Sequence, residues 1–128
     1  HSGADVNAVN VVAAMKNDAS SLKPGTTGSK MLAPGPNDHV FVYFADHGGP
    51  GILGMPTQPD LYATDFVDAI VTISKTAAKV VVYVEACESG SIFDGVLPAG
   101  IDNVYVTTAA NPSESSWGYA HHTKPKPQ

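Results

Sequence analysis

The stretch VVVYVEACESGS, residues 80–91, runs an almost purely apolar segment into a short polar and acidic turn. Its first seven residues are mostly β-branched or aromatic, which predicts a strand, 80–86, buried on both faces of a sheet. Cys87, the only cysteine of the chain, comes directly after this strand. A lone cysteine is ordinarily an inert buried thiol, so its position at a strand end raises the question of a function.

Two other apolar stretches predict partners for this strand. HVFVYFA, residues 39–45, precedes it and stops abruptly at a glycine-rich loop, and NVYVTTAA, residues 103–110, follows it. Between the first two strands, apolar residues recur at helical spacing and predict a helix from Thr64, its N-cap, through Lys79. A strand, a helix and a strand in succession form the unit of a parallel sheet that lies between helices.

The remaining segments complete the expected organisation. Residues 4–19 predict a first helix, capped by Asp5 or Asn7, and a loop rich in glycine, proline and serine leads from it to the first strand. Residues 52–63 predict a loop or a short irregular strand. We therefore expect an α/β fold, a three-layer α/β/α sandwich with a mainly parallel sheet.

The composition is that of an ordinary globular chain, with 43% hydrophobic and 15% charged residues among 128. A net charge of −5, with lysines as the only basic residues besides histidine, argues against nucleic acid or an anionic membrane as a partner. The single cysteine excludes an internal disulfide and a cysteine-based zinc site, and we expect no cofactor. The chain opens without a methionine or a signal peptide, so we expect a piece of a longer protein.

A histidine and the cysteine are predicted at one edge of the sheet. In parallel sheets, binding sites lie beyond the carboxyl ends of the strands. His47 lies just past the strand 39–45 and Cys87 just past the strand 80–86. Neighbouring strands are about 4.8 Å apart, so the two side chains can meet across one cleft. The other histidines are a terminal residue, the first residue of a strand and two in the polar tail: His1, His39, His121 and His122.

This pair has the composition of a nucleophilic site. A thiol becomes a nucleophile when a base takes its proton or a positive neighbour stabilises the thiolate. Acyl transfer also needs donors for the developing oxyanion, and the amides of Gly48 and Cys87 are suitably placed in the sequence. A bland alternative stays open, because a His-Gly-Gly sequence is a weak motif and many strand ends have a histidine for solubility.

Three longer motifs resemble a known family. YFADHGGPGILGMP (43–56), YVEACESGSIF (83–93) and TTAANPSESS (107–116) are similar to the legumain family of cysteine peptidases, peptidase C13 of clan CD. These are the asparaginyl endopeptidases, called vacuolar processing enzymes in plants, and the sequence around His47 resembles the plant branch more than the animal branch. Caspases and the transamidase subunit that attaches GPI anchors share the arrangement of a strand before His-Gly and a strand before Cys. Their sequences around these residues match less closely. The resemblance implies a partial caspase-like peptidase core over residues 1–119, followed by a polar, disordered tail over 120–128.

The resemblance assigns roles to the residues at the sheet edge. His47 and Cys87 match the catalytic dyad of the family, and Gly48 matches its oxyanion glycine. Asp46 matches an aspartate that can cyclise to a succinimide, although it could equally be a strand-end cap. Glu85 matches a wall of the pocket for the substrate's asparagine side chain, and strand alternation directs it to the same face as Cys87. Within an apolar strand, we expect the Glu85 carboxylate to be buried, which would itself suggest a functional reason.

Other polar residues have a role by resemblance and an ordinary alternative. Ser116 matches a second polar contact in the asparagine pocket, where a hydroxyl and a carboxylate can satisfy a primary amide. Ser115 would take part beside it, although both could be plain loop serines. Glu88, next to the nucleophile, could recognise substrate or could be a solvated turn residue.

The chain also departs from the family pattern. The resemblance implies an arginine and a downstream acidic residue to complete the asparagine pocket, and an upstream asparagine to support the histidine; this chain has no arginine. The first one or two strands of the family's six-stranded sheet and its autoinhibitory C-terminal prodomain also have no counterpart. A partial sheet of this kind is expected to expose an apolar edge and face.

Two classes of function follow from these observations. The first is a cysteine endopeptidase of the vacuole or lysosome that cleaves protein and peptide substrates after asparagine, or after aspartate at lower pH, through a thioester, with peptide ligation as a side activity. The second is a non-catalytic homologue that acts as a binding or structural partner. A caspase-like enzyme selective for aspartate or basic residues is a third reading, separable by its substrate preference.

Overall fold

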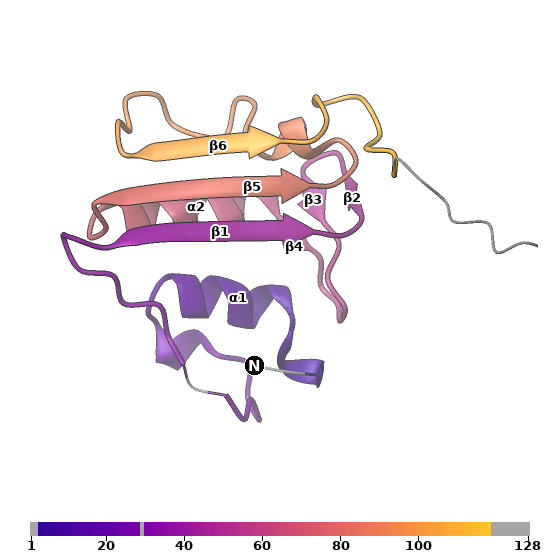
Figure 1. Ribbon diagram of the computed structural model, residues 1–128. Helices are drawn as coiled ribbons and strands as arrows, with labels where there is room; N and C mark the ends of the chain where they lie inside the picture. The colour runs from indigo at the N-terminus through magenta and orange to yellow at the C-terminus, as the bar shows by residue number, and fades with distance from the viewer. Residues whose placement is uncertain (1–2, 29, 119–128) are drawn as a thin grey trace, which may run out of the picture.

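A computed structural model describes residues 3–28 and 30–118, so the tail predicted over 120–128 lies outside the described residues. Within these described ranges, the fold consists of two α-helices and six strands (Figure 1). The helices are α1 (Ala8–Met15) and α2 (Ala63–Ser74), with single 3₁₀ turns at Gly3–Asp5, Ala19–Ser21 and Ser89–Ile92. The strands are β1 (His39–Ala45), β2 (Gly48–Gly49), β3 (Ile52–Leu53), β4 (Leu61–Tyr62), β5 (Lys79–Glu85) and β6 (Val104–Thr108).

The main sheet has the order β1-β5-β6, and both pairs of strands are parallel. The three predicted strands are confirmed, with β1 as expected, β5 one residue earlier and β6 shorter at both ends. β2, β3 and β4 form a second, small antiparallel sheet. It occupies the stretch 52–63 for which a loop or short irregular strand was predicted, together with the glycines that follow His47.

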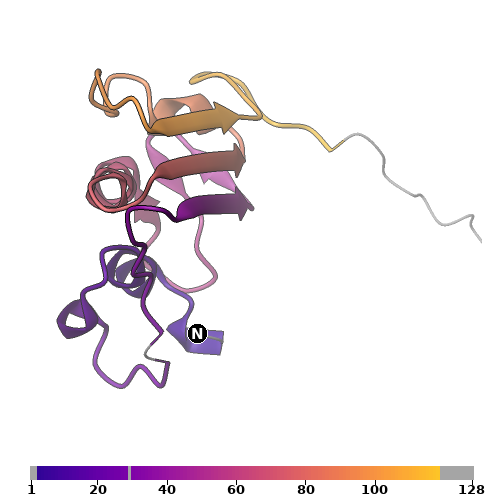
Figure 2. The ribbon, with the colours of Figure 1, turned by 60° about the vertical axis from the view of Figure 1, so that its left-hand side comes forward.

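The core lies between α2 and one face of the main sheet (Figure 2). Alternate residues of β5, namely Val80, Val82 and Val84, are at most 2% exposed and belong to this core. From α2, Phe66 and Ile70 are equally buried. The period of two along the strand and of about 3.6 along the helix directs both apolar sets to the same interface. This packing confirms the α/β class with a mainly parallel sheet.

The opposite face of the main sheet is aromatic and open. Phe41, Tyr43 and Tyr105 are each about three-fifths exposed, and Tyr83 is 42% exposed. Phe41 and Tyr83 make an edge-to-face contact with ring centroids 5.3 Å apart. Within residues 3–28 and 30–118, no helix covers this face; α2 lies behind the sheet in Figure 1 and on the opposite side of it in Figure 2. The expectation that the sheet would expose an apolar face is therefore met, and the described residues build two of the three expected layers.

Both helices begin and end differently from the prediction. Asn7, one of the two predicted caps, accepts a hydrogen bond from the amide of Asn10 at 3.0 Å, and α1 therefore starts at Ala8 rather than at residue 4. The prediction that Thr64 caps α2 is wrong. The helix starts at Ala63, whose amide donates to the carbonyl of Gly51 at 2.9 Å, so a backbone group of the small sheet replaces a side-chain cap.

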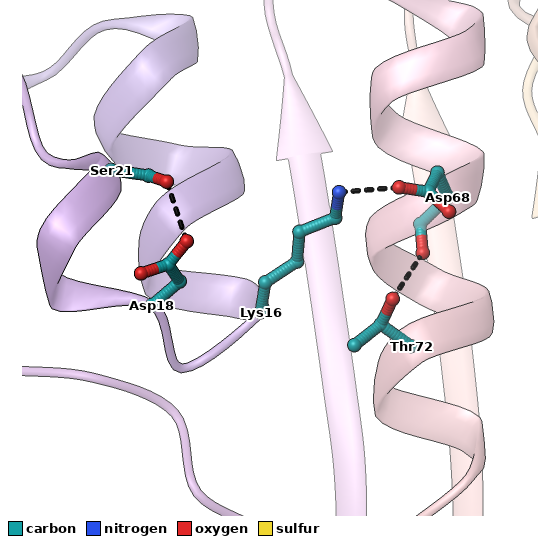
Figure 3. Close-up of polar contacts among 5 residues, drawn as sticks. All are labelled: Lys16, Asp18, Ser21, Asp68 and Thr72. Atoms are coloured by element: carbon teal, nitrogen blue, oxygen red, sulfur yellow. Dashed lines mark hydrogen bonds and ion pairs between the residues drawn. The ribbon is translucent and has the colours of Figure 1, made fainter.

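One ion pair joins the two helices at the surface, and a separate set of local hydrogen bonds lies beside it (Figure 3). The ammonium of Lys16, just after α1, pairs with the carboxylate of Asp68 on α2. Asp18 accepts hydrogen bonds from the hydroxyls of Ser20 and Ser21, and these bonds lower the pKa of its carboxyl group. Because these groups are largely solvated, the contacts fix local geometry and contribute little to the free energy of unfolding.

No helix in the described part of the chain is long and apolar enough to cross a membrane.

The contact between α2 and the sheet predicts the effect of a core truncation. Phe66→Ala removes a ring that is 2% exposed and packs against Phe93. We expect it to lower the free energy of unfolding by about 3–5 kcal/mol, measured by urea denaturation. Thr64→Ala, on the exposed side of the same helix, is the control and should change the free energy by less than about 0.5 kcal/mol. Equal effects of the two changes would contradict the described packing.

Candidate active site

The site lies where β1 and β5 end. The two strands pair in register from His39 and Lys79 to Ala45 and Glu85, and the amide of Asp46 then donates to the carbonyl of Glu85 at 3.2 Å. His47 lies two positions past the end of β1, and Cys87 lies two positions past the end of β5. The pocket at this edge, of about 320 Å³, is lined by Ala45, Asp46, His47, Glu85, Ala86, Cys87 and Ser116. The structure thus brings the predicted histidine and cysteine into one pocket.

The loop that follows β1 is a tight hairpin. Gly48 and Gly49 of β2 pair with β3, and the amide of Gly54 donates to the carbonyl of His47 at 2.8 Å. Gly51, at the hairpin turn, has φ of +71°, a conformation that favours glycine. The peptide N–H of His47 donates to Oδ1 of Asp46 at 2.8 Å. The backbone of His47 is therefore fixed on both sides, while its side chain is exposed in the pocket.

Gly48 lets this hairpin approach the cysteine. A Cβ added at Gly48 would lie 2.5 Å from the carbonyl oxygen of Cys87 and 2.8 Å from Cβ of Ala86. Both distances are far below van der Waals contact, and the carbonyl belongs to backbone that cannot turn away. Gly48, predicted as a donor to the oxyanion, is thus also required by sterics, because only glycine allows the two loops this separation.

The segment after β5 holds the thiol at the surface of the pocket. Cys87 is half-buried, and its Sγ lies 3.8 Å from the carbonyl oxygen of Ser116. Glu88 has φ of +48°, in the left-handed region, and its amide donates to the carbonyl of Glu114 at 2.8 Å. Cys87 is therefore not a fully buried, inert thiol. The chain turns sharply behind it, and the segment 111–116 packs against that turn.

The carboxylate of Glu85 is exposed, so the prediction that it is buried was wrong. Val82, Val84 and Ala86 face α2, and the alternation directs Glu85 to the open aromatic face, where solvent reaches it. Its Oε1 accepts a hydrogen bond from the hydroxyl of Ser116. The two residues assigned to the asparagine pocket therefore form one polar group at the rim of the site.

Two other predicted residues lie outside the pocket lining. Ser115 is exposed, and Glu88 is half-buried with its backbone, not its side chain, engaged beside the site. Sequence reasoning missed Glu114, whose carbonyl holds the amide of Glu88 and whose carboxylate caps Asn111 at 2.9 Å. It also missed Ser91, although Ser91 is part of the quoted motif. No group of three or more metal-binding side chains occurs within the described ranges.

The close approach at Gly48 predicts a change in stability. Gly48→Ala must push the hairpin away from Cys87, and we expect a loss of about 1–3 kcal/mol in the free energy of unfolding. The neighbouring Gly49→Ala is the matched control, since its Cβ would meet only the side chain of Ile52 at 3.4 Å. Thermal denaturation of both variants measures the difference. A Gly48→Ala protein as stable as the Gly49→Ala protein would mean that the loops are not packed as described.

Comparisons with known proteins identify the family of the chain. The model of the Peptidase C13 family matches residues 1–127. A vacuolar-processing enzyme of Vicia sativa is 51% identical over 93% of the chain and 24% of its own length. The vacuolar-processing enzyme beta-isozyme of Arabidopsis thaliana is 48% identical over 99% of the chain and 26% of its own length. Legumain of Canavalia ensiformis is 42% identical over 99% of the chain and 27% of its own length. The chain thus spans about a quarter of these relatives, and it belongs to the peptidase C13 family.

Proposed function

We propose that this chain forms the nucleophilic centre of a cysteine endopeptidase that cleaves after asparagine. The observation that supports this most is the shared pocket of His47 and Cys87 at the ends of two paired parallel strands. The hydrogen-bonded pair of Glu85 and Ser116 at its rim supports the specificity. Membership of the peptidase C13 family supports a protein or peptide substrate, and the name of the vacuolar-processing enzymes supports a vacuolar location.

The proposed reaction has two halves. The Cys87 thiol gives its proton to His47 as the sulfur attacks the scissile carbonyl carbon, and the amides of Gly48 and Cys87 donate hydrogen bonds to the oxyanion. The tetrahedral intermediate collapses, the C–N bond breaks, and His47 gives a proton to the leaving amine, which leaves a thioester on Cys87. Water, losing its proton to His47, then attacks the thioester, and the acid product leaves as the thiol is restored. An incoming amine in place of water gives peptide ligation.

The rim supplies the proposed preference for asparagine. The Glu85 carboxylate accepts a hydrogen bond from the substrate's side-chain amide nitrogen, and the Ser116 hydroxyl, released from Glu85, donates to the amide oxygen. An aspartate presents the same groups only when it is protonated, so cleavage after aspartate requires lower pH. A side chain that covers these groups without pairing with them leaves a donor or an acceptor unsatisfied and binds less well. Ser115 and Glu88, outside the pocket, would contact substrate only beyond this side chain.

Asp46 fits the proposed succinimide. The amide nitrogen of His47 already lies 2.8 Å from Oδ1 of Asp46. In the cyclisation that nitrogen bonds to Cγ of Asp46 and a water molecule leaves, which gives a five-membered ring between the two residues. A role for Asp46 as a simple strand-end cap would leave the residue unmodified, and the mass of a peptide spanning Asp46 and His47 distinguishes the two.

The open aromatic face favours a second candidate function. Phe41, Tyr43, Tyr83 and Tyr105 form an exposed apolar surface of the kind that binds another polypeptide segment. A non-catalytic homologue could use this surface as a binding or structural partner. The two candidates differ in whether Cys87 turns over substrate.

A fluorogenic Ala-Ala-Asn peptide at mildly acidic pH tests the proposed enzyme. We expect turnover that Cys87→Ala lowers by at least about 1000-fold, because the nucleophile is lost. A folded protein with neither turnover nor labelling of Cys87 by an asparaginyl electrophile would leave the non-catalytic function. Faster cleavage after aspartate or basic residues than after asparagine would favour a caspase-like specificity.

A second variant tests the asparagine pocket. Ser116→Ala should lower kcat/KM for the asparaginyl peptide about tenfold, since one hydrogen bond to the substrate is removed. Ser113→Ala is the control in the same segment, because its hydroxyl bonds only to the side chain of Asn111. Equal kcat/KM values for the two variants would exclude Ser116 from substrate recognition.

A further inference from the structure

We propose that Ser91 is a positioning residue that sets the His47 hairpin against the Cys87 loop. This inference rests on the proposed function, because it concerns the geometry of the same pair. The Ser91 hydroxyl donates to the carbonyl of Glu88 at 2.6 Å and accepts the amide of Gly51 at 2.8 Å. Ser91 does not line the pocket, so it acts through the two loops and not on the substrate.

One end of this bridge holds the turn behind the nucleophile. Glu88 follows Cys87 directly and has φ of +48°, an unfavourable conformation for a residue with a Cβ. Its carbonyl accepts both the amide of Ser91 at 2.9 Å and the Ser91 hydroxyl. Its amide is held by Glu114. These hydrogen bonds over-determine the peptide of Glu88 and so fix the backbone that presents Cys87.

The other end of the bridge holds the tip of the hairpin. The amide of Gly51 donates to Ser91, and the carbonyl of Gly51 accepts the first amide of α2, that of Ala63. The base of the same hairpin is closed by the bond from Gly54 to His47. A shift of the hairpin tip is therefore transmitted to His47 through two short paired strands.

The bond from the Gly51 amide to the Ser91 hydroxyl is the one direct hydrogen bond between these two described loops. Within the fully described segments 47–54 and 87–92, no other hydrogen bond joins one to the other. The remaining link is the steric approach of Gly48 to Cys87, which limits how close the loops come but does not hold them together. A hydroxyl can donate and accept at once. Alanine at this position would leave the Gly51 amide without its partner and loosen the pair.

A double-mutant cycle on the alkylation of Cys87 by iodoacetamide tests the proposal. We expect Ser91→Ala to slow alkylation roughly tenfold in the natural background, because His47 is displaced from the thiol. In a His47→Ala background the same change should have no further effect, since the group through which Ser91 acts is gone. Equal slowing in both backgrounds would overturn the proposal, because Ser91 would then act on the cysteine loop alone.

Two sets of variants separate positioning from plain stability. Ser91→Thr keeps the hydroxyl and should alkylate at the natural rate. Ser91→Val has the shape of the threonine variant without the hydroxyl and should alkylate slowly. These two variants replace Ser91→Ala if Ser91→Ala does not fold. Ser74→Ala removes a hydroxyl bonded to a backbone carbonyl in α2 and should leave alkylation unchanged. Alkylation by Ser91→Val as fast as by Ser91→Thr would overturn the proposal.

Peptide turnover gives an independent readout. Ser91→Ala should lower kcat about 10- to 100-fold with little change in KM, since the substrate contacts at Glu85 and Ser116 are intact. A protein that shows the alkylation cycle but no peptide turnover would retain the positioning role while the proposed function fails. An unchanged kcat in a protein that does turn over peptide would overturn the positioning role alone.

Discussion

The in-register parallel pairing of β1 with β5 is the constraint on which the site depends. Because Ala45 lies opposite Glu85, the two strands end at the same level, and whatever follows them meets at one edge. A shift of one residue in either strand would move its side chains to the other face of the sheet and separate His47 from Cys87. The burial of Val82 and Val84 against α2 opposes such a one-residue shift, because the shift would turn both side chains toward solvent. The core thus fixes the relative height of His47 and Cys87.

Regular patterns of apolar residues along the sequence made much of this arrangement predictable. The β-branched runs identified all three strands of the main sheet, and the parallel arrangement followed from the helix between the first two. The rule for carboxyl ends then brought His47 and Cys87 together without any knowledge of the fold. The start of α2 was not predictable in this way, because its first amide is satisfied by Gly51, a residue twelve positions upstream whose carbonyl is brought there by the small sheet.

The sequence pattern could not reveal the hydrogen bonds that hold the site together. The bond between Ser116 and Glu85 joins residues 31 apart, and that between Ser91 and Gly51 joins residues 40 apart. Such contacts leave no local period. The exposure of Glu85 was mispredicted for a related reason, because an apolar strand suggests burial on both faces, whereas the described chain covers only one. Gly48 was noticed for its amide, while its steric role needed the neighbouring loop.

The two faces of β5 therefore answer to different demands. The side chains toward α2 pack in the core, and Glu85, on the other side, lines the pocket at the edge together with Cys87, which follows the strand. Adjacent residues of one strand are only about 3.3 Å apart along the chain, yet they point in opposite directions. A lineage, or a protein engineer, can consequently change the recognition of ligands at alternate positions of this strand while the interior sequence stays as it is.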